Sequence, residues 1–224
     1  MNDVLAAKVV DTSSSGETRQ RILHTAEHLF AERGIAAVSI RDITRAANVN
    51  LGAINYHFGA KRNLAAEVFK NCFEPVKVRQ MALLDQMENQ AGGPPLSLEM
   101  ILEALVRPVV ERGFVEGAEG DTFLRLMGGC FSEPDIEIRQ LVRAHFDKLI
   151  RRFDAAFLRA VPGLRPEELF WCVNFIHGAL HLSLLASAEQ GGLLSEFKRK
   201  LDAPGLVQRL ITFMAAGFRS AVIH

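Results

Sequence analysis

The chain has 224 residues, of which 49% are hydrophobic, and its formal net charge is zero. Ala, Leu, Glu and Arg are abundant and β-branched runs are scarce, which predicts an all-α protein with a substantial core. Three widely separated cysteines, Cys72, Cys130 and Cys172, argue against a disulfide framework and a C-x-x-C zinc site. No signal peptide is evident and no run approaches about 20 apolar residues, so we expect a cytoplasmic protein without a membrane span.

The N-terminal residues 1–16 are expected to form a flexible arm, because they end in a Ser-Ser-Ser-Gly cluster. The first helix is predicted over about 17–33. Arg19 and Arg21 lie near its start, where they oppose the helix dipole. They are either solvated charges or phosphate contacts, and the sequence leaves both interpretations open.

The stretch 39–61 predicts two short helices joined by a tight turn. Ser39 is a good N-cap, and Asp42 lies three residues on, where it can reach back to the free amides of the first turn. Asn48 tolerates the left-handed backbone and can turn the chain sharply, while Gly59 can end the second helix. This spacing indicates a helix-turn-helix.

The outer face of the second short helix is small or hydrogen-bonding and carries no acid. A helix that enters a DNA major groove needs such a surface, because carboxylates would repel the phosphates. Residues 17–63 also carry a net charge of +3, whereas 64–224 carry −2. An ordinary helical hairpin with a polar outer face is the alternative interpretation.

Further helices are predicted over about 61–89, 98–115, 121–131, 134–161, 167–190 and 204–222. Pro75 is expected to kink or break the first of these and Pro108 to bend the second. The last two helices are more apolar than one core face requires. This excess predicts a homodimer interface in which two helices from each subunit form a four-helix bundle.

Two histidine pairs have the i, i+4 spacing of metal ligands on a helix: His24 with His28, and His177 with His181. Two ligands without a third partner make a poor metal site, so packing in the core or an interface is favoured. No phosphate-binding glycine loop and no nucleophile elbow is present. The sequence therefore predicts no metal, no cofactor and no enzymatic activity.

Several residues of the C-terminal helices could line a cavity for a small hydrophobic ligand, with a few polar anchors among them. The alternative for each is a plain helical core. The candidate pocket residues are Phe123, Arg125, Met127, Cys130, Phe146, Ile150, Phe153, Trp171, Asn174, Phe175, His177 and Gly178.

Residues 26–61, AEHLFAERGIAAVSIRDITRAANVNLGAINYHFGAK, resemble the N-terminal module of the TetR family of bacterial transcription regulators. The resemblance covers about 18–70 and departs mildly at Thr44, Asn48 and Ala60. It implies a homodimer whose three N-terminal helices bind DNA, with 17–63 as the DNA-binding domain and 64–224 as the ligand-binding and dimerisation domain. The implied DNA-contacting residues are Ser39, Arg41, Leu51, Gly52, Ala53, Asn55, Tyr56, His57 and Lys61.

The segments 165–182 and 213–220 are similar to the PsrA-like branch of that family, whose members respond to long-chain fatty acids or acyl-CoA. The resemblance thus implies a repressor released from a palindromic double-stranded DNA operator by a small hydrophobic effector. One alternative is the same fold acting as an activator or sensing a non-lipid effector. Another is a helical ligand-binding protein that does not bind DNA.

Overall fold

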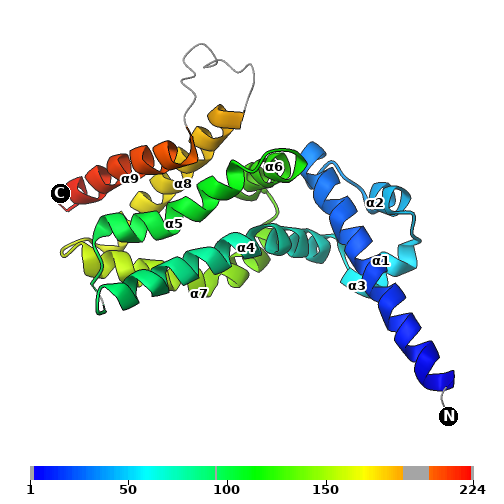
Figure 1. Ribbon diagram of the computed structural model, residues 1–224. Coiled ribbons are helices and arrows are strands. Elements are labelled where there is room, and N and C mark those ends of the chain that lie inside the picture. Colours follow the sequence, from blue (N-terminus) through cyan, green and yellow to red (C-terminus); the bar gives the residue numbers. More distant parts are fainter. Residues whose placement is uncertain (1–2, 94, 189–201, 223–224) are drawn as a thin grey trace. The chain divides into compact units, whose positions relative to one another are not determined.

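The computed structural model describes residues 3–93, 95–188 and 202–222 (Figure 1). Within these residues the chain forms nine α-helices and no strand, which confirms the all-α prediction. The helices are α1 (Asp3–Arg33), α2 (Ile40–Ala47), α3 (Leu51–Phe58), α4 (Lys61–Gln90), α5 (Leu98–Gly113), α6 (Ala118–Ser132), α7 (Ile136–Ala160), α8 (Pro166–Ala188) and α9 (Ala203–Ser220).

The chain divides into two compact units. The first contains Met1–Cys72 and Gly128–Ala144, and the second contains Phe73–Met127 and His145–His224. The division therefore falls inside α4, and parts of α6 and α7 belong to the first unit. The sequence analysis assigned no part of 128–144 to the N-terminal domain.

In the first unit, α1 packs against α2 and α3, and α2 packs against α3 (Figure 1). Each helix contributes apolar side chains at helical spacing to one small core. Its fully buried members include Ile22, Ala26, Ile43, Ile54 and Leu64.

Helix α1 begins at Asp3 and not near residue 17, so the predicted start of the first helix is wrong. The Ser-rich run 13–15 does not interrupt the helix. Adding residues to an existing helix costs far less than nucleating a new one. The segment Leu5–Ala7 contains two of the best helix formers, which favours continuation towards the N-terminus.

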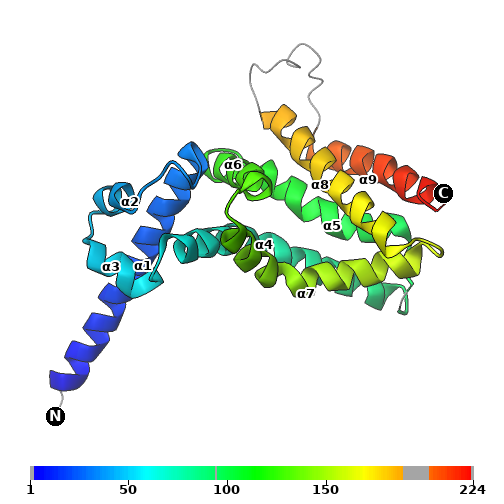
Figure 2. The ribbon, with the colours of Figure 1, turned by 180° about the vertical axis from the view of Figure 1, so that it is seen from behind.

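In the second unit, α9 packs against α5 and α8, and α5 also packs against α8 (Figure 2). The rings of Phe157 and Phe218 are in contact in its core, with centroids 4.9 Å apart. Ion pairs join α4 to α7 within the same unit: Arg152 donates to Asp85 at 2.6 Å and to Glu88 at 2.7 Å.

Neither internal proline ends its helix. Helix α4 continues through Pro75, and α5 continues through Pro108. Of the two outcomes expected at Pro75, a break is therefore excluded, and a kink stays a prediction. A proline removes one backbone hydrogen bond, and the buried side chain of Val76, next in sequence, holds the helix against the core.

Within the described residues, Pro166–Leu185 of α8 is long and apolar enough to cross a membrane by length and composition alone. This differs from the expectation that no stretch would approach that limit. Leu169, Ile176 and Leu184 of this helix are buried inside the second unit. Helix α8 therefore has one face buried against the second unit and an exposed apolar side.

Candidate nucleic-acid interface

The start of α2 is fixed by a reciprocal pair of hydrogen bonds. The Asp42 backbone N–H donates to Ser39 Oγ at 3.1 Å, and the Ser39 N–H donates to Asp42 Oδ2 at 2.9 Å. The Ser39 hydroxyl also donates to the same carboxylate oxygen. These bonds from the Ser39 side chain and backbone lower the pKa of Asp42 below its ordinary value. The predicted capping arrangement is confirmed.

The turn between α2 and α3 depends on Asn48, whose φ of 51° and ψ of 54° lie in the left-handed region. Among the described residues it is the only non-glycine with positive φ. Asn50 then caps α3, since its Oδ1 accepts a hydrogen bond from the Ala53 N–H at 2.9 Å. Gly59, with φ of 73°, ends α3. The predicted roles of Asn48 and Gly59 are confirmed.

Helix α3 separates into a buried and an exposed face. Ile54 is completely buried and Phe58 is 6% exposed, so both anchor the helix to the core. Tyr56 is 80% exposed and Leu51 is 56% exposed. Gly52 and Asn55 are also exposed, whereas Ala53 and His57 are half-buried.

Basic side chains accompany this helix. Arg41 is exposed on α2, and Lys61 is half-buried at the first position of α4. Arg45 follows Arg41 by four residues, is also exposed, and was missed by the sequence analysis. The i, i+4 spacing, which puts both on one side of α2, could have identified it. These three form no ion pair with the described residues, so their charges remain available to phosphates.

Arg19 has a role that the sequence analysis did not foresee. Its guanidinium lies over the ring of Phe58, 5.2 Å from the centroid, and its Nη2 donates to Glu67 Oε2 at 2.9 Å. It therefore connects α1 to the end of α3 and to α4. Arg62, beside Lys61, is also occupied, because it pairs with Glu137 of the same unit.

The predicted effector residues do not share one environment. Phe123 is buried and contacts the ring of Phe73, with centroids 5.3 Å apart, and Phe73 contacts Phe146 with centroids 6.3 Å apart. Phe153 contacts Phe157 in the core. Met127 is buried, Ile150 is half-buried and Arg125 is exposed.

Two further candidates have shifted pKa values. Cys130 lies in the first unit, where burial, with the nearby Glu133 carboxylate, raises the pKa of its thiol to about 11. Burial lowers the pKa of His177, so its neutral imidazole is favoured. In the part of the chain that the structure describes, no group of three or more His, Cys, Asp or Glu could hold a metal.

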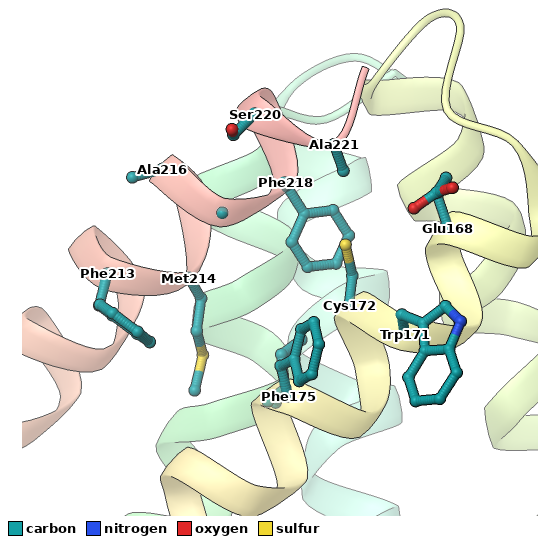
Figure 3. A pocket seen from close by; sticks show the side chains of 12 residues that line it. Glu168, Trp171, Cys172, Phe175, Phe213, Met214, Ala216, Phe218, Ser220 and Ala221 are labelled. Carbon is teal, nitrogen blue, oxygen red and sulfur yellow. The ribbon is translucent and has the colours of Figure 1, made fainter. Parts of the chain in front are cut away.

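The remaining candidates lie on the outer side of α8. Trp171 and Phe175 are 55% and 66% exposed, and their rings stack. With Phe213 and Met214 of α9 they line an open hollow of about 540 Å³ (Figure 3). Asn174 and Gly178 are exposed on the same helix.

An exposed apolar surface extends beyond this hollow. We call it the α8–α9 face, and it consists of Phe170, Trp171, Phe175, Leu182 and Phe213, each more than half exposed.

The capped pair α2–α3, with the acid-free exposed face of α3 and adjacent cations, defines a helix-turn-helix protein of the DNA-binding class. Residues 22–68 match the family described as bacterial regulatory proteins, tetR family. Residues 103–217, about half of the chain, match the family described as tetracyclin repressor-like, C-terminal domain. The chain therefore belongs to the TetR family of transcription regulators.

Individual relatives agree with this assignment. The transcriptional regulator AcrR of Shigella flexneri is 33% identical over 97 residues, which cover 42% of this chain and 43% of AcrR. The transcriptional repressor KstR2 of Rhodococcus jostii is 38% identical over 60 residues, which cover 27% of this chain and 29% of KstR2. The chain thus matches less than half the length of these relatives.

A solved structure supports the fold over nearly the whole chain. It is a transcriptional regulator from Saccharomonospora viridis in complex with choline, 19% identical, with a TM-score of 0.57 and coverage of 89% of this chain and 96% of that one. The matched families and relatives are regulators and not enzymes, which confirms the expectation of no enzymatic activity.

Proposed function

We propose that the chain is a homodimeric repressor that binds a palindromic DNA operator and is released from it by a small hydrophobic effector. The observation that carries this proposal is the exposed, acid-free face of α3, presented by a capped turn and flanked by Arg41, Arg45 and Lys61. Residues 17–63 would bind DNA, and 64–224 would hold the effector and the dimer interface. Such a regulator works in the cytoplasm, where its DNA is.

Phosphate contacts follow from the positions of Tyr56 and Lys61. The Tyr56 side chain is 80% exposed at the C-terminal part of α3. Lys61 is the first residue of α4, where the free amides of a helix start also favour a phosphate. Ser39, at the start of α2, and the half-buried His57 complete the proposed phosphate-binding set.

The test uses a duplex selected from a random-sequence pool by the wild-type protein. Lys61→Ala is expected to weaken binding and to reduce the slope of log affinity against log salt by about one, because one phosphate contact is lost. Tyr56→Ala is expected to weaken binding as well. Both should keep the wild-type melting temperature.

Lys70→Ala is the matched control, since Lys70 is exposed on α4 but pairs with Glu67. Wild-type affinity in both Tyr56→Ala and Lys61→Ala would refute the phosphate assignment. Absence of any salt-dependent DNA binding by the wild type would refute the proposed function.

The second subunit is proposed to cover the α8–α9 face. Beyond its exposed aromatic side chains, two glycines support this occupant. Gly178 in α8 and Gly217 in α9 are exposed, and a Cβ at either would meet no atom within 4 Å. A glycine inside a helix costs up to about 1 kcal/mol relative to alanine. Bare backbone at both places allows close approach by helices of a second copy.

For the effector, a long apolar molecule is proposed, such as a fatty acid or its acyl-CoA. The aromatic contacts among Phe73, Phe123 and Phe146 show that the second unit has an apolar interior. A structure of similar fold was solved with a small molecule, choline, which supports effector binding in general but not a lipid.

The effector test measures release of the selected duplex by acyl-CoA of increasing chain length. Long chains are expected to release DNA at concentrations where short chains do not, because each buried CH₂ adds about 0.8 kcal/mol of binding. An alkyl sulfate of equal chain length controls for detergent action. If neither long nor short acyl chains release the duplex, a lipid effector is excluded.

A further inference from the structure

The asparagines around α3 differ in what their amides do. The Asn50 side chain caps α3 through its bond with the Ala53 N–H. The Asn63 Nδ2 donates to the Phe58 carbonyl at 3.0 Å. Asn55, between them in sequence, is exposed, and its side chain makes no hydrogen bond with the described residues. Asn55 is the asparagine that lies within α3 itself, and its amide is available to an external partner.

Leu51 is the second unusual residue of this helix. The other large aliphatic and aromatic residues that anchor α3, Ile54 and Phe58, are buried. Leu51 is 56% exposed, although it is apolar and lies at the first helical position. Its side chain therefore presents an apolar surface one turn before Asn55 on the same side of the helix.

We infer that Leu51 and Asn55 select A·T base pairs in the operator. A side-chain amide is matched to adenine, since its oxygen accepts from N6 and its nitrogen donates to N7 in the major groove. An exposed aliphatic side chain is matched to the C5 methyl of thymine, the apolar group that the major groove offers. This inference rests on the proposed DNA binding and adds the base identity.

The spacing of the two residues fits base pairs that lie about two steps apart. Four helical residues rise about 6 Å along the axis, which corresponds to roughly two base-pair steps of about 3.4 Å. Gly52 lies between them on the exposed side, and a Cβ there would come within 3.2 Å of Asn50 Oδ1. Glycine thus preserves the cap of α3 and lets the backbone approach the base edges.

The experiment first selects duplexes from a random-sequence pool with the full-length wild-type protein. Each half-site is expected to contain A·T pairs about two steps apart. In the selected duplex, single thymines are then replaced by deoxyuridine, which removes only the methyl group. Single adenines are replaced by 7-deazaadenine, which removes only the N7 acceptor.

The wild type is expected to lose about fourfold in affinity per half-site at one deoxyuridine position, the value of one buried methyl. At one 7-deazaadenine position it is expected to lose about tenfold, near the lower end for a bidentate contact. The Leu51→Ala variant should bind the thymine duplex more weakly and become insensitive to deoxyuridine. The Asn55→Ala variant should bind the adenine duplex more weakly and become insensitive to 7-deazaadenine.

Two matched variants control for general effects. Val78→Ala removes an apolar side chain that is also 56% exposed, and Asn71→Ala removes another exposed amide of α4. Both should keep the sensitivity of the wild type to each modified base.

Two outcomes would overturn the inference while leaving DNA binding intact. One is that the selected half-sites contain G·C pairs at the positions where A·T pairs are expected. The other is equal sensitivity to the modified bases in the wild type and in the two α3 variants. A wild-type protein that binds no duplex in a salt-dependent manner would overturn both the proposed function and this inference.

Discussion

Asn48 holds a backbone conformation that costs most L-residues roughly 1–2 kcal/mol. Asparagine lowers this cost because its short amide can bond locally. Glycine would not incur the cost at all, because it has no Cβ. Ser39 and Asn50 act beside it, since each satisfies a backbone N–H that a helix start leaves free. Asn48 and Asn50 therefore set the turn between α2 and α3, while Ser39 fixes the start of α2.

The capping bonds of Asp42 give a pH-dependent prediction. Because its pKa is lowered in the folded chain, its contribution to stability is present above the ordinary aspartate pKa, about 4. It is lost as the pH falls through the lowered value. Asp42→Asn should therefore reduce the free energy of unfolding at pH 7, and the difference from wild type should shrink in acid.

Urea unfolding followed by circular dichroism at several pH values measures this difference. In a Ser39→Ala background the effect of Asp42→Asn should be smaller, because the side-chain hydroxyl partner is gone. A difference that grows towards acid would contradict the assignment.

At the scale of the helix, Arg19 connects three elements. Its ring contact reaches the last residue of α3, and its ion pair reaches Glu67 of α4. The direction in which α3 presents its exposed face thus depends partly on a side chain of α1. Helix α4 then continues through Pro75, so a single element contains both Lys61 and the division between the two units.

Arg19→Met is expected to lower the free energy of unfolding by about 1 kcal/mol. An exposed ion pair contributes about 0.2–1 kcal/mol, and an exposed cation–π contact adds about 0.5–1 kcal/mol. Affinity for the selected duplex should fall as well, because α3 is held less firmly. Chemical denaturation and a DNA titration measure the two effects.

Arg21→Met is the matched control, since Arg21 is exposed on the same helix and makes no ion pair with the described residues. An equal effect of both substitutions would show that the contacts of Arg19 have no particular role.

For the whole molecule, the sequence predicted the parts that depend on local signals. Ser39, Asn48 and Gly59 each act on their immediate neighbours, so their residue types alone place the ends of α2 and α3. The contribution of 128–144 to the first unit could not be predicted in this way. It depends on contacts between residues far apart in sequence, such as Arg62 and Glu137.

The predicted pocket residues show the same limit. Helix α8 is apolar on most sides, so periodicity cannot distinguish the buried Ile176 from the exposed Phe175. Interfaces between subunits and the cores of single chains use the same apolar residue types, so residue type does not tell the two apart. Trp171 and Phe175, which the sequence predicts to line a pocket, line the open hollow and also belong to the exposed α8–α9 face.

The proposed dimer gives a prediction for the molecule as a whole. Phe213→Ser should shift the protein from dimer to monomer in sedimentation equilibrium, because this side chain is 70% exposed and central to the proposed contact. Its helical content should stay unchanged, since the isolated chain buries little of that ring. Affinity for a palindromic duplex should fall, because one subunit occupies only half of it.

Val78→Ser provides the control, since it places the same polar residue at an exposed apolar position outside the α8–α9 face. If the Phe213→Ser protein has the same dimer dissociation constant as the wild type, this face is not the interface.

If the α8–α9 face is the dimer interface, it also determines how the regulator responds to its own abundance. If subunits must pair before two copies of α3 can occupy an operator, then well below the dissociation constant the concentration of competent protein follows the square of the subunit concentration. Halving the amount of chain would then reduce operator-competent dimers about fourfold. A change in the supply of the protein would then change the concentration of operator-competent dimer more than proportionally.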